Sequence, residues 1–329
     1  MKILITGIAG LLGCHVADFL LKQGHSIVGV DDLSGGYLDN VPEQAKFYKL
    51  NLQNSEAIDV VFENEKPDVV FHFAAYAAEG LSRYIKKYNY ENNVISSVNI
   101  INSCIKHKVK KLIFSSSMAV YGSQQTPFSE EMKPHPEDSY GIAKYSVEQD
   151  LKDSYSHFGL NYAIVRPHNV FGPKQNIWDK YRNVIGIWLR QALNSQPLTI
   201  FGDGQQTRAF SNIKYYMEPF EKLLHNYSDE IFNIGADQHY KIIDVANIVK
   251  NIAEKHGIKT TIKHLEPRNE VKHAFCNHDK AKTMLDFKDE TNLEKLIEEM
   301  FIWARSQPDR KIRHMDYELT KNLYSFWKI

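Results

Sequence analysis

Short apolar runs alternate with longer amphipathic segments over the first half of the chain. A strand buried in a parallel sheet is a near-continuous apolar run, whereas a helix that covers a sheet repeats its apolar residues every three or four positions. Alternation of this kind predicts an α/β fold with a doubly wound parallel sheet of Rossmann type. The predicted strands are 2–6, 26–30, 46–50, 68–73, 111–116 and 161–166. The first predicted helix follows the glycines at 7–13 and runs to about residue 23, and the others are 55–65, 91–107 and 139–158.

The pattern changes after Pro167, where segments become shorter and proline and aromatic residues more frequent. Here helices are predicted at 183–194, 241–255 and 292–306, and a strand at 198–201. We predict a Rossmann-type domain at 1–167 and a smaller mixed α/β domain at 168–329. The second domain is expected not to be independent, and some of its segments are expected to return to the sheet. The stretch 307–329 is expected to pack either on the core or on a partner subunit.

A glycine-rich turn follows the first predicted strand. In Gly7-Ile-Ala-Gly10-Leu-Leu-Gly13 the glycines permit a tight turn and let backbone N–H groups approach a pyrophosphate at the start of the next helix. Asp31 ends the second strand, where a carboxylate accepts hydrogen bonds from a ribose and repels a 2′-phosphate. The turn therefore predicts a dinucleotide site that prefers NAD to NADP, although a glycine turn without any ligand has the same sequence.

Tyr140 and Lys144 lie four residues apart on the helix predicted at 139–158, so both can face one substrate. A phenol with an ordinary pKa near ~10 is a poor base at neutral pH unless a cation favours its phenolate. Lys144 is expected to supply that cation, and an oxidised nicotinamide ring to supply a second. Ser117 is expected to share the hydrogen bond to a substrate hydroxyl that Tyr140 deprotonates. Taken alone this spacing is weak, because a packed tyrosine and a solvated lysine have it by chance.

Composition excludes several classes of protein. The 329 residues include 40 basic and 40 acidic side chains, so no net charge points to nucleic acid or to an anionic membrane. Three scattered cysteines and 14 histidines form no disulfide framework and no familiar metal-ligand spacing, and no metal is expected. No apolar run reaches the ~18 residues of a membrane span. A cytoplasmic protein is expected.

Six segments occur in a fixed order along the chain: Thr6-Gly-Ile-Ala-Gly-Leu-Leu-Gly13, Asp31, His72-Phe-Ala-Ala75, Ser115-Ser-Ser-Met-Ala-Val-Tyr-Gly122, Tyr140-Gly-Ile-Ala-Lys144 and Arg166-Pro-His-Asn-Val-Phe-Gly-Pro173. Together they resemble the extended short-chain dehydrogenase/reductases, and among them the nucleotide-sugar epimerase/dehydratase family. The resemblance covers nearly the whole chain and implies NAD as cofactor, a nucleotide sugar as substrate and a homodimer paired through the helices at 91–107 and 139–158.

The resemblance also implies the site residues. Catalytic roles are expected for Ser117, Tyr140 and Lys144. Cofactor contacts are expected for Gly7, Gly10, Leu11, Leu12, Gly13, Asp31, Asp32, Asn51, Leu52, Phe73, Ala74, Ala75, Tyr140 and Lys144. Substrate contacts are expected for Ser117, Asn169, Asn183, Val184, Leu198, Ile200, Arg208 and Arg268, the two arginines clamping the diphosphate.

Two departures from the family pattern stand out. The segment after Arg208 lacks the acidic residues usual there, and Asn51 stands where an aspartate often contacts the adenine.

Three functions are compatible with these residues. The family begins by oxidising the sugar 4-hydroxyl, and its 4,6-dehydratases then use an Asp-Glu pair where this chain has Met118 and Ala119. Neither residue transfers protons, which favours return of the hydride to the other face of the ketone. We therefore expect an NAD-dependent nucleotide-sugar 4-epimerase of the UDP-hexose or UDP-uronic acid type. A nucleotide-sugar 4-dehydrogenase and a non-catalytic NAD-binding regulator remain as alternatives.

Overall fold

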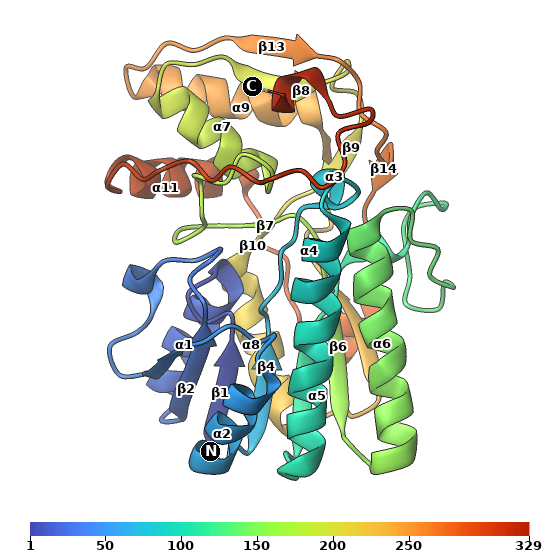
Figure 1. Ribbon diagram of the computed structural model, residues 1–329. Helices are drawn as coiled ribbons and strands as arrows, with labels where there is room; N and C mark the ends of the chain where they lie inside the picture. Colours follow the sequence, from blue (N-terminus) through green and yellow to red (C-terminus); the bar gives the residue numbers. More distant parts are fainter. Residues whose placement is uncertain (329) are drawn as a thin grey trace.

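The computed structural model describes residues 1–328, and within them a parallel sheet of seven strands forms the centre of the larger lobe (Figure 1). The strands lie in the order β11-β6-β5-β4-β1-β2-β3, all parallel. This confirms the predicted fold class. The strands are β1 (Lys2–Thr6), β2 (Ser26–Asp31), β3 (Lys46–Lys49), β4 (Val69–His72), β5 (Lys111–Ser115), β6 (Tyr162–Pro167) and β11 (Glu230–Ile234).

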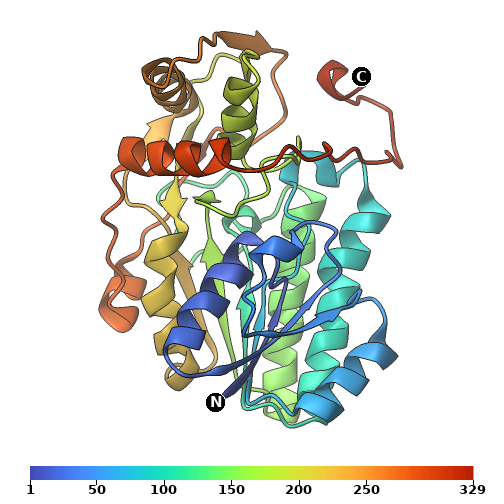
Figure 2. The ribbon, with the colours of Figure 1, turned by 90° about the vertical axis from the view of Figure 1, so that its left-hand side faces the viewer.

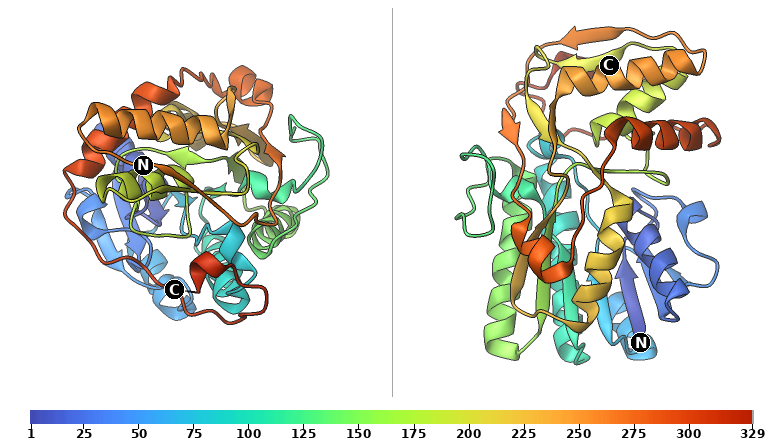
Figure 3. Two further views of the ribbon diagram at one scale, coloured as in Figure 1. Left: turned by 90° about the horizontal axis from the view of Figure 1, so that it is seen from above. Right: turned by 180° about the vertical axis from the view of Figure 1, so that it is seen from behind.

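Helices cover both faces of this sheet. Ile3 and Ile5 of β1 face one core and Leu4 between them faces the other, because side chains alternate along a strand. The Leu4 side is covered by α2 (Ser55–Glu65), α5 (Ser96–Lys106) and α6 (Ser139–Phe158), in front of the sheet in Figure 1. The Ile3 side is covered by α1 (Leu11–Lys22), α8 (Met217–His225) and α10 (Asp279–Leu285), which face the viewer in the right panel of Figure 3.

A smaller lobe lies beyond the carboxyl ends of the sheet strands (Figure 1). Its own apolar core joins three helices: α7 (Val184–Leu193), α9 (Ile242–Lys255) and α11 (Leu293–Arg305). The short strands of this lobe and of its junction with the sheet are β7 (Val170–Phe171), β8 (Leu198–Phe201), β9 (Thr207–Ala209), β10 (Ser211–Asn212), β12 (His239–Lys241), β13 (Ile262–Leu265) and β14 (His273–Ala274).

The chain returns to the large sheet after it has entered the second lobe. Helix α8 packs beside α1, and β11 then pairs with β6, with Phe232 opposite Val165. Neither element was predicted. Both are short, and Pro219 in the first turn of α8 masks its helical pattern, although proline is tolerated there.

The helix predicted at 91–107 begins earlier than expected and is not uniform. It starts as α4 (Lys86–Tyr90), passes through a π-helical turn at Glu91–Ile95 and continues as α5 to Lys106. The extra residue in the π turn places Asn93 inward, where its side chain accepts from the backbone N–H of Tyr76 (3.0 Å) and donates to the carbonyl oxygen of the same residue (3.2 Å). This turn therefore fixes the loop that follows β4.

The segment after α11 crosses between the two lobes (Figure 2). Arg310 pairs with Asp39, and the backbone N–H groups of Lys87 and Tyr88 donate to Glu318. Trp327 near its end is buried, with its ring against Tyr84 of the large lobe and against Tyr181 and Tyr324. Of the two packing arrangements left open for this stretch, the structure shows packing on the core for the described residues.

All three cysteines are buried and unpaired. Cys14 lies in α1, Cys104 in α5 and Cys276 beside β14, each within apolar surroundings. Over residues 1–328, none of the helices combines the length and the apolar character needed to cross a membrane.

Candidate active site

A cavity of about 490 Å³ lies between the carboxyl edge of the sheet and the smaller lobe. The loops after β1, β2, β4 and β5 form one side of it, and the segments 167–210 and 268–271 with the C-terminal residues form the other. Ligands of open α/β sheets bind at this edge. All the predicted cofactor and substrate residues except Leu198 line this cavity.

The glycine-rich turn is shaped by close backbone contacts. A Cβ atom on Gly13 would lie 2.2 Å from the carbonyl oxygen of Gly7, and one on Gly7 would lie 2.7 Å from the backbone nitrogen of Ala74. Gly10 is the N-cap of α1 and makes no side-chain hydrogen bond. The first backbone N–H groups of the helix therefore have no acceptor from the cap residue, and this end of α1 lies at the cavity. Unsatisfied donors at a helix N-terminus suit a pyrophosphate, and this loop fits NAD.

Asp31 supports the turn as well as facing the cavity. Its two carboxylate oxygens accept hydrogen bonds from the backbone N–H groups of Ala9 (3.0 Å) and Leu33 (2.8 Å). Burial is the main cause that raises the pKa of Asp31, and these two hydrogen bonds lower it. Each oxygen has a second lone pair for a ribose hydroxyl. Asp32 and Asn51 also line the cavity, and each accepts a backbone hydrogen bond within its own turn.

Ser117, Tyr140 and Lys144 come together at the ends of β5 and α6. Tyr140 is buried in the cavity wall, and the Lys144 ammonium group lies 5.9 Å from the centre of its ring. Lys144 is 2% exposed and donates to the carbonyl oxygen of Ser115 at 2.8 Å. Ser117 follows β5, and its hydroxyl accepts from the backbone N–H of Ala119 at 3.1 Å.

Burial opposes the charged form of both central groups. It lowers the pKa of Lys144 to about 7, partly offset by Glu148. It also raises the pKa of Tyr140 above its ordinary value, and the negative charge of Glu79 adds to that rise. Burial therefore reduces the charge that Lys144 carries at neutral pH. The second cation expected beside Tyr140, an oxidised nicotinamide ring, would add to it.

Two asparagines on the long helix fix the start of α6. Asn89 donates to the backbone carbonyl oxygen of Ser139 at 2.8 Å and is joined to Asn93 by a 2.9 Å hydrogen bond. Asp138 caps α6, accepting from the backbone N–H groups of Tyr140 and Gly141, both at 2.9 Å. These contacts hold Tyr140 in a fixed relation to the loop after β4.

The two arginines predicted to clamp phosphates meet at one carboxylate. Glu270 accepts from Arg208 at 3.3 Å and from Arg268 at 3.5 Å. The Arg268 guanidinium group also lies 3.9 Å from the centre of the Phe201 ring. The two guanidinium groups face one cavity wall together, where their planar forks suit the oxygens of a diphosphate.

The other predicted substrate residues are divided between cavity and core. Asn169 lines the cavity and donates to the carbonyl oxygen of Ala209 at 2.8 Å. Asn183 precedes α7, which begins at Val184, and its side chain is bound to the carbonyl oxygen of Val170. Ile200 lines the cavity, but Leu198 does not, because its side chain is fully buried in the core of the smaller lobe.

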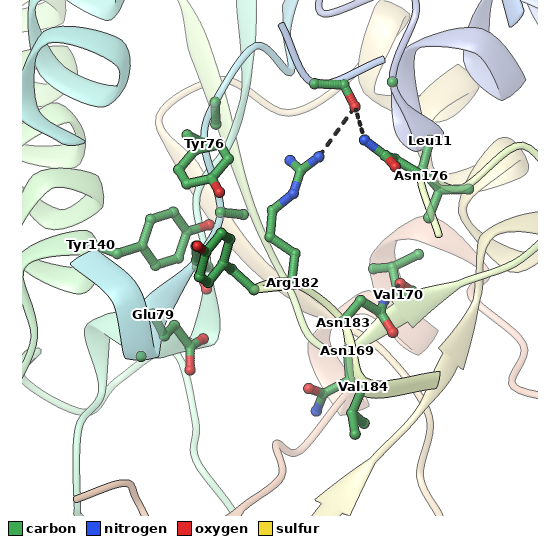
Figure 4. Close-up of a pocket in the computed structure, with 18 of the residues that line it drawn as sticks. Leu11, Tyr76, Glu79, Tyr140, Asn169, Val170, Asn176, Arg182, Asn183 and Val184 are labelled. Carbon is green, nitrogen blue, oxygen red and sulfur yellow. Dashed lines mark hydrogen bonds between the residues drawn. The ribbon is translucent and has the colours of Figure 1, made fainter. Parts of the chain in front are cut away.

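Several lining residues were not predicted. Tyr324, Phe326 and Trp327 line the cavity from the far end of the chain, a contact that no local sequence pattern indicates. Arg182 donates to the carbonyl oxygen of Gly35 and lies beside Asn176 and Tyr76 in Figure 4. Glu79 lies below Tyr140 in the same view, and its negative charge acts on the phenol. In the sequence, only the position of Arg182 directly before the predicted Asn183 could have indicated that Arg182 lines the cavity.

Comparisons with known proteins agree with this arrangement. The chain is 29% identical over 328 residues to a UDP-glucose 4-epimerase of Halalkalibacterium halodurans, covering 94% of this chain and 97% of the relative. The structure of a UDP-glucose 4-epimerase from Thermotoga maritima with UDP-glucose superposes with a TM-score of 0.88 at 31% identity, covering 93% and 99%. The structure of a UDP-glucuronic acid 4-epimerase from Bacillus cereus, solved with UDP-glucuronic acid and NAD, superposes with a TM-score of 0.84 at 27% identity. The match covers 93% of this chain and 99% of the Bacillus cereus chain.

A sequence profile described as the NAD dependent epimerase/dehydratase family matches residues 3–235. The matched range runs from β1 to β11, so it includes the glycine-rich turn, the Tyr140–Lys144 pair and every strand of the large sheet. The family predicted from the six motifs is confirmed: this chain belongs to the NAD-dependent epimerase/dehydratase family.

Proposed function

We propose that the protein is an NAD-dependent nucleotide-sugar 4-epimerase. The observation that carries the proposal is the single cavity in which Tyr140, Ser117 and Lys144 face a nucleotide-binding turn on one side and a pair of arginines on the other. A nucleotide sugar that spans this cavity would have its diphosphate at Arg208 and Arg268 and its sugar at Tyr140. The relatives named above, which act on UDP-glucose and UDP-glucuronic acid, support the same reaction.

The residues of this chain divide the reaction between them. Tyr140 takes the proton of the sugar 4-hydroxyl, and Ser117 holds that oxygen by a hydrogen bond while the C4 hydride leaves. NAD, when bound, accepts and returns this hydride and brings a positive nicotinamide ring that favours the phenolate. Tyr140 returns the proton once the ketone has received the hydride on its other face, which inverts C4.

The chain has no proton-transfer residues where a 4,6-dehydratase needs them. Met118 and Ala119 follow Ser117 directly, and Met118 is buried in an apolar cluster with Val120 and Phe128. A net 4-dehydrogenase would use the same Ser117, Tyr140 and Lys144, so only an experiment distinguishes it from a 4-epimerase.

The test is an NMR time course of the purified protein with UDP-glucose, UDP-galactose, their N-acetyl and uronic forms and GDP-mannose, with absorbance at 340 nm recorded in parallel. An epimer that forms without accumulation of NADH is expected. A keto sugar with stoichiometric NADH would contradict the proposal and establish the dehydrogenase. Neither product from any sugar would favour the non-catalytic regulator.

We also propose a homodimer paired through α5 and α6 with the π turn. Large apolar side chains are exposed on these elements: Ile95, Ile142, Tyr155 and Phe158, the last of them 65% exposed. Ile142→Glu is expected to shift the mass measured by light scattering from dimer to monomer. Ile302→Glu, on the exposed face of α11, is the matched control and should leave the dimer intact. A monomeric wild-type protein at micromolar concentration would contradict this proposal.

The division of labour proposed for the chain follows the two lobes. Residues 1–167 would hold NAD, and residues 168–329 would supply most contacts to the nucleotide sugar. A cytoplasmic location is proposed as well, because unpaired thiols persist in a reducing compartment.

A further inference from the structure

Glu79 differs from the other acidic residues of the cavity wall. Over residues 1–328, no hydrogen bond or ion pair reaches its carboxylate, although the side chain is exposed to the cavity. The remaining acids that line the cavity each accept at least one hydrogen bond, and they are Asp31, Asp32, Glu137, Asp138 and Glu270. Glu79 therefore presents an unused acceptor to whatever fills the cavity.

The position of Glu79 relative to Tyr140 is fixed by the fold. Glu79 begins the short helix α3 (Glu79–Ser82), and Ser82 donates to the backbone carbonyl oxygen of Glu79 at 2.7 Å. The Ser82 hydroxyl also lies 3.5 Å from Asp138, which caps α6 beside Tyr140. In Figure 4, Glu79 lies below Tyr140 on the same side of the view, and its carboxylate points away from the phenol ring.

The other side of Glu79 faces the phosphate-binding arginines. A Cβ atom on the neighbouring Gly80 would lie 3.3 Å from a terminal nitrogen of Arg268. The charge of Glu79 acts on both Arg208 and Tyr140. Glu79 thus lies between the group that would contact the 4-hydroxyl and the groups that would contact the diphosphate, which is where the hexose ring must lie.

A carboxylate at this place discriminates between sugars by charge. It accepts hydrogen bonds from the hydroxyl groups of a neutral hexose, and bonds to a charged acceptor are stronger than those between neutral groups. A uronic acid brings a second carboxylate to the carbon next to C4. Like charges at short range inside a protein repel each other much more strongly than in water.

We propose that Glu79 determines sugar specificity: it accepts a hydrogen bond from the hexose of the nucleotide sugar and excludes the corresponding uronic acid. This inference rests on the proposed function and narrows its substrate class to nucleotide sugars with an uncharged hexose. Glu79 is a binding residue here, and the transfer of hydride at C4 does not pass through it.

The protonation of Glu79 sets the pH range of this discrimination. The Glu79 carboxylate faces the cavity and not the outer surface of the protein, and this desolvation raises its pKa above the ordinary value. The charges of Asp138 and Glu270 also raise it, whereas Arg208 and Arg268 lower it. The carboxylate therefore becomes fully charged only as pH rises. Discrimination against a uronic acid should increase with pH in the wild type and lose this dependence in Glu79→Gln.

The test separates binding from turnover. Dissociation constants of UDP-glucose and UDP-glucuronic acid are measured by calorimetry on the NAD-loaded protein in a Tyr140→Phe background, with and without Glu79→Gln. Glutamine keeps the size of the side chain and removes its charge. We expect at least ~10-fold weaker binding of UDP-glucose and at least ~10-fold tighter binding of UDP-glucuronic acid in the double variant, in line with loss of a charge-assisted hydrogen bond and of a repulsion.

Glu137→Gln is the matched control, because Glu137 lines the same cavity but binds Ser123 on the exposed rim. Its ratio of the two dissociation constants should stay within ~3-fold of the parent. An unchanged ratio in Glu79→Gln, or equal binding of both sugars by the parent, would overturn the inference. Loss of turnover in Glu79→Gln with unchanged binding would also overturn it and assign proton transfer to Glu79.

The proposed function is judged by a different readout, the appearance of a 4-epimer with the wild-type protein. If Glu79→Gln shifts the ratio of the two dissociation constants but the wild type forms no epimer, the specificity inference stands and the 4-epimerase proposal fails. If the wild type forms an epimer but Glu79→Gln leaves the ratio unchanged, the 4-epimerase proposal stands and the specificity inference fails.

Discussion

Tyr140 lies in surroundings that resist its ionisation until a ligand alters them. Burial and the nearby Glu79 raise the pKa of the phenol, and Lys144 is itself held near a pKa of about 7 by burial. Such a tyrosine stays protonated at neutral pH in the free protein. Under the proposed function, the positive nicotinamide ring of bound NAD would favour its phenolate.

The phenol oxygen of Tyr140 is the proposed base, so its removal should stop the reaction without emptying the cofactor site. Tyr140→Phe is expected to lower kcat for epimerisation at least ~10²-fold, in line with loss of a general base. The amount of NAD bound, measured after release from the protein, should stay at the wild-type level. Near-normal turnover would remove Tyr140 from the mechanism.

Asp31 combines a structural and a binding role. Asp31→Ala should weaken NAD at least ~10-fold, because hydrogen bonds to a charged acceptor are worth ~1.5–3 kcal/mol. NADP should lose less, since its 2′-phosphate no longer meets a carboxylate. Titration of both cofactors, with thermal unfolding to verify that the turn at Ala9 and Leu33 survives, checks this. Equal losses for NAD and NADP would contradict a ribose contact.

At the scale of elements, α6 is fastened to the sheet by a buried ion pair. Glu148 of α6 is fully buried and accepts from Arg166 of β6 at 2.9 and 2.5 Å and from Ser116 after β5 at 2.5 Å. Arg166 also donates to the Tyr121 hydroxyl at 2.8 Å. Arg166 is the first residue of the segment 166–173, one of the six family motifs. Its contacts to Glu148 give this residue of the motif a structural role, which is to hold α6 against the sheet.

Loss of one partner from this pair leaves the other charge buried and unpaired. Glu148→Ala is expected to lower the free energy of unfolding by ~3–5 kcal/mol, measured by urea denaturation. The matched control is Glu254→Ala, which removes an exposed pair with Lys250 on α9 and should cost less than ~1 kcal/mol. A cost for Glu148→Ala as small as that of the control would contradict the assignment.

Elements with a strong apolar pattern were predictable and others were not. The helix at 139–158 has the predicted bounds, and β1 and β8 do as well, because each is a periodic or apolar segment with clear stops. The π turn at Glu91–Ile95 had no such signal, because Asn92 and Asn93 interrupt the apolar pattern. Asn93 contacts Tyr76 in the loop after β4, and Asn92 donates to the carbonyl oxygen of Tyr88 in its own helix.

The candidate site was predictable where motifs carry it. The glycine turn, Asp31 and the Tyr140–Lys144 pair follow from local spacing, whereas Glu79 is an ordinary acid in sequence and gains meaning only from the neighbours that the fold brings to it. Leu198 shows the opposite error. It shares a strand with Ile200, but a core packed from α7 and α9 takes up its side chain.

For the whole molecule, two buried histidines make stability depend on pH. Burial lowers the pKa of His72 and of His168 to about 3. The unfolded chain binds protons at both from about pH 6.5 downwards, so the free energy of unfolding falls as pH falls towards 3. Each histidine contributes up to ~1.4 kcal/mol per pH unit. Glu79 has the opposite effect, because its raised pKa lets the folded protein bind up to one proton more than the unfolded chain.

Comparison of variants isolates the histidine contribution. His72→Gln is expected to reduce the dependence of the unfolding free energy on pH between 6.5 and 5 by up to one proton, as measured by urea denaturation at several pH values. Its overall stability should also fall, because His72 joins Thr6 (2.7 Å) to Ser97 (2.8 Å). An unchanged dependence on pH would show that His72 takes up a proton in the folded protein as well.

The burial of the cysteines makes the native protein poorly reactive towards thiol reagents. Burial raises the pKa of the Cys14 thiol to about 12, and it raises the pKa values of Cys104 and Cys276 as well. A thiolate is the form that attacks a maleimide, so all three should react slowly while the protein is folded. Cysteines introduced at the exposed positions Glu56 and Ile302 would then carry a donor and an acceptor dye on the two lobes. Energy transfer between the dyes could follow the lobes during turnover in a chain that keeps its own cysteines.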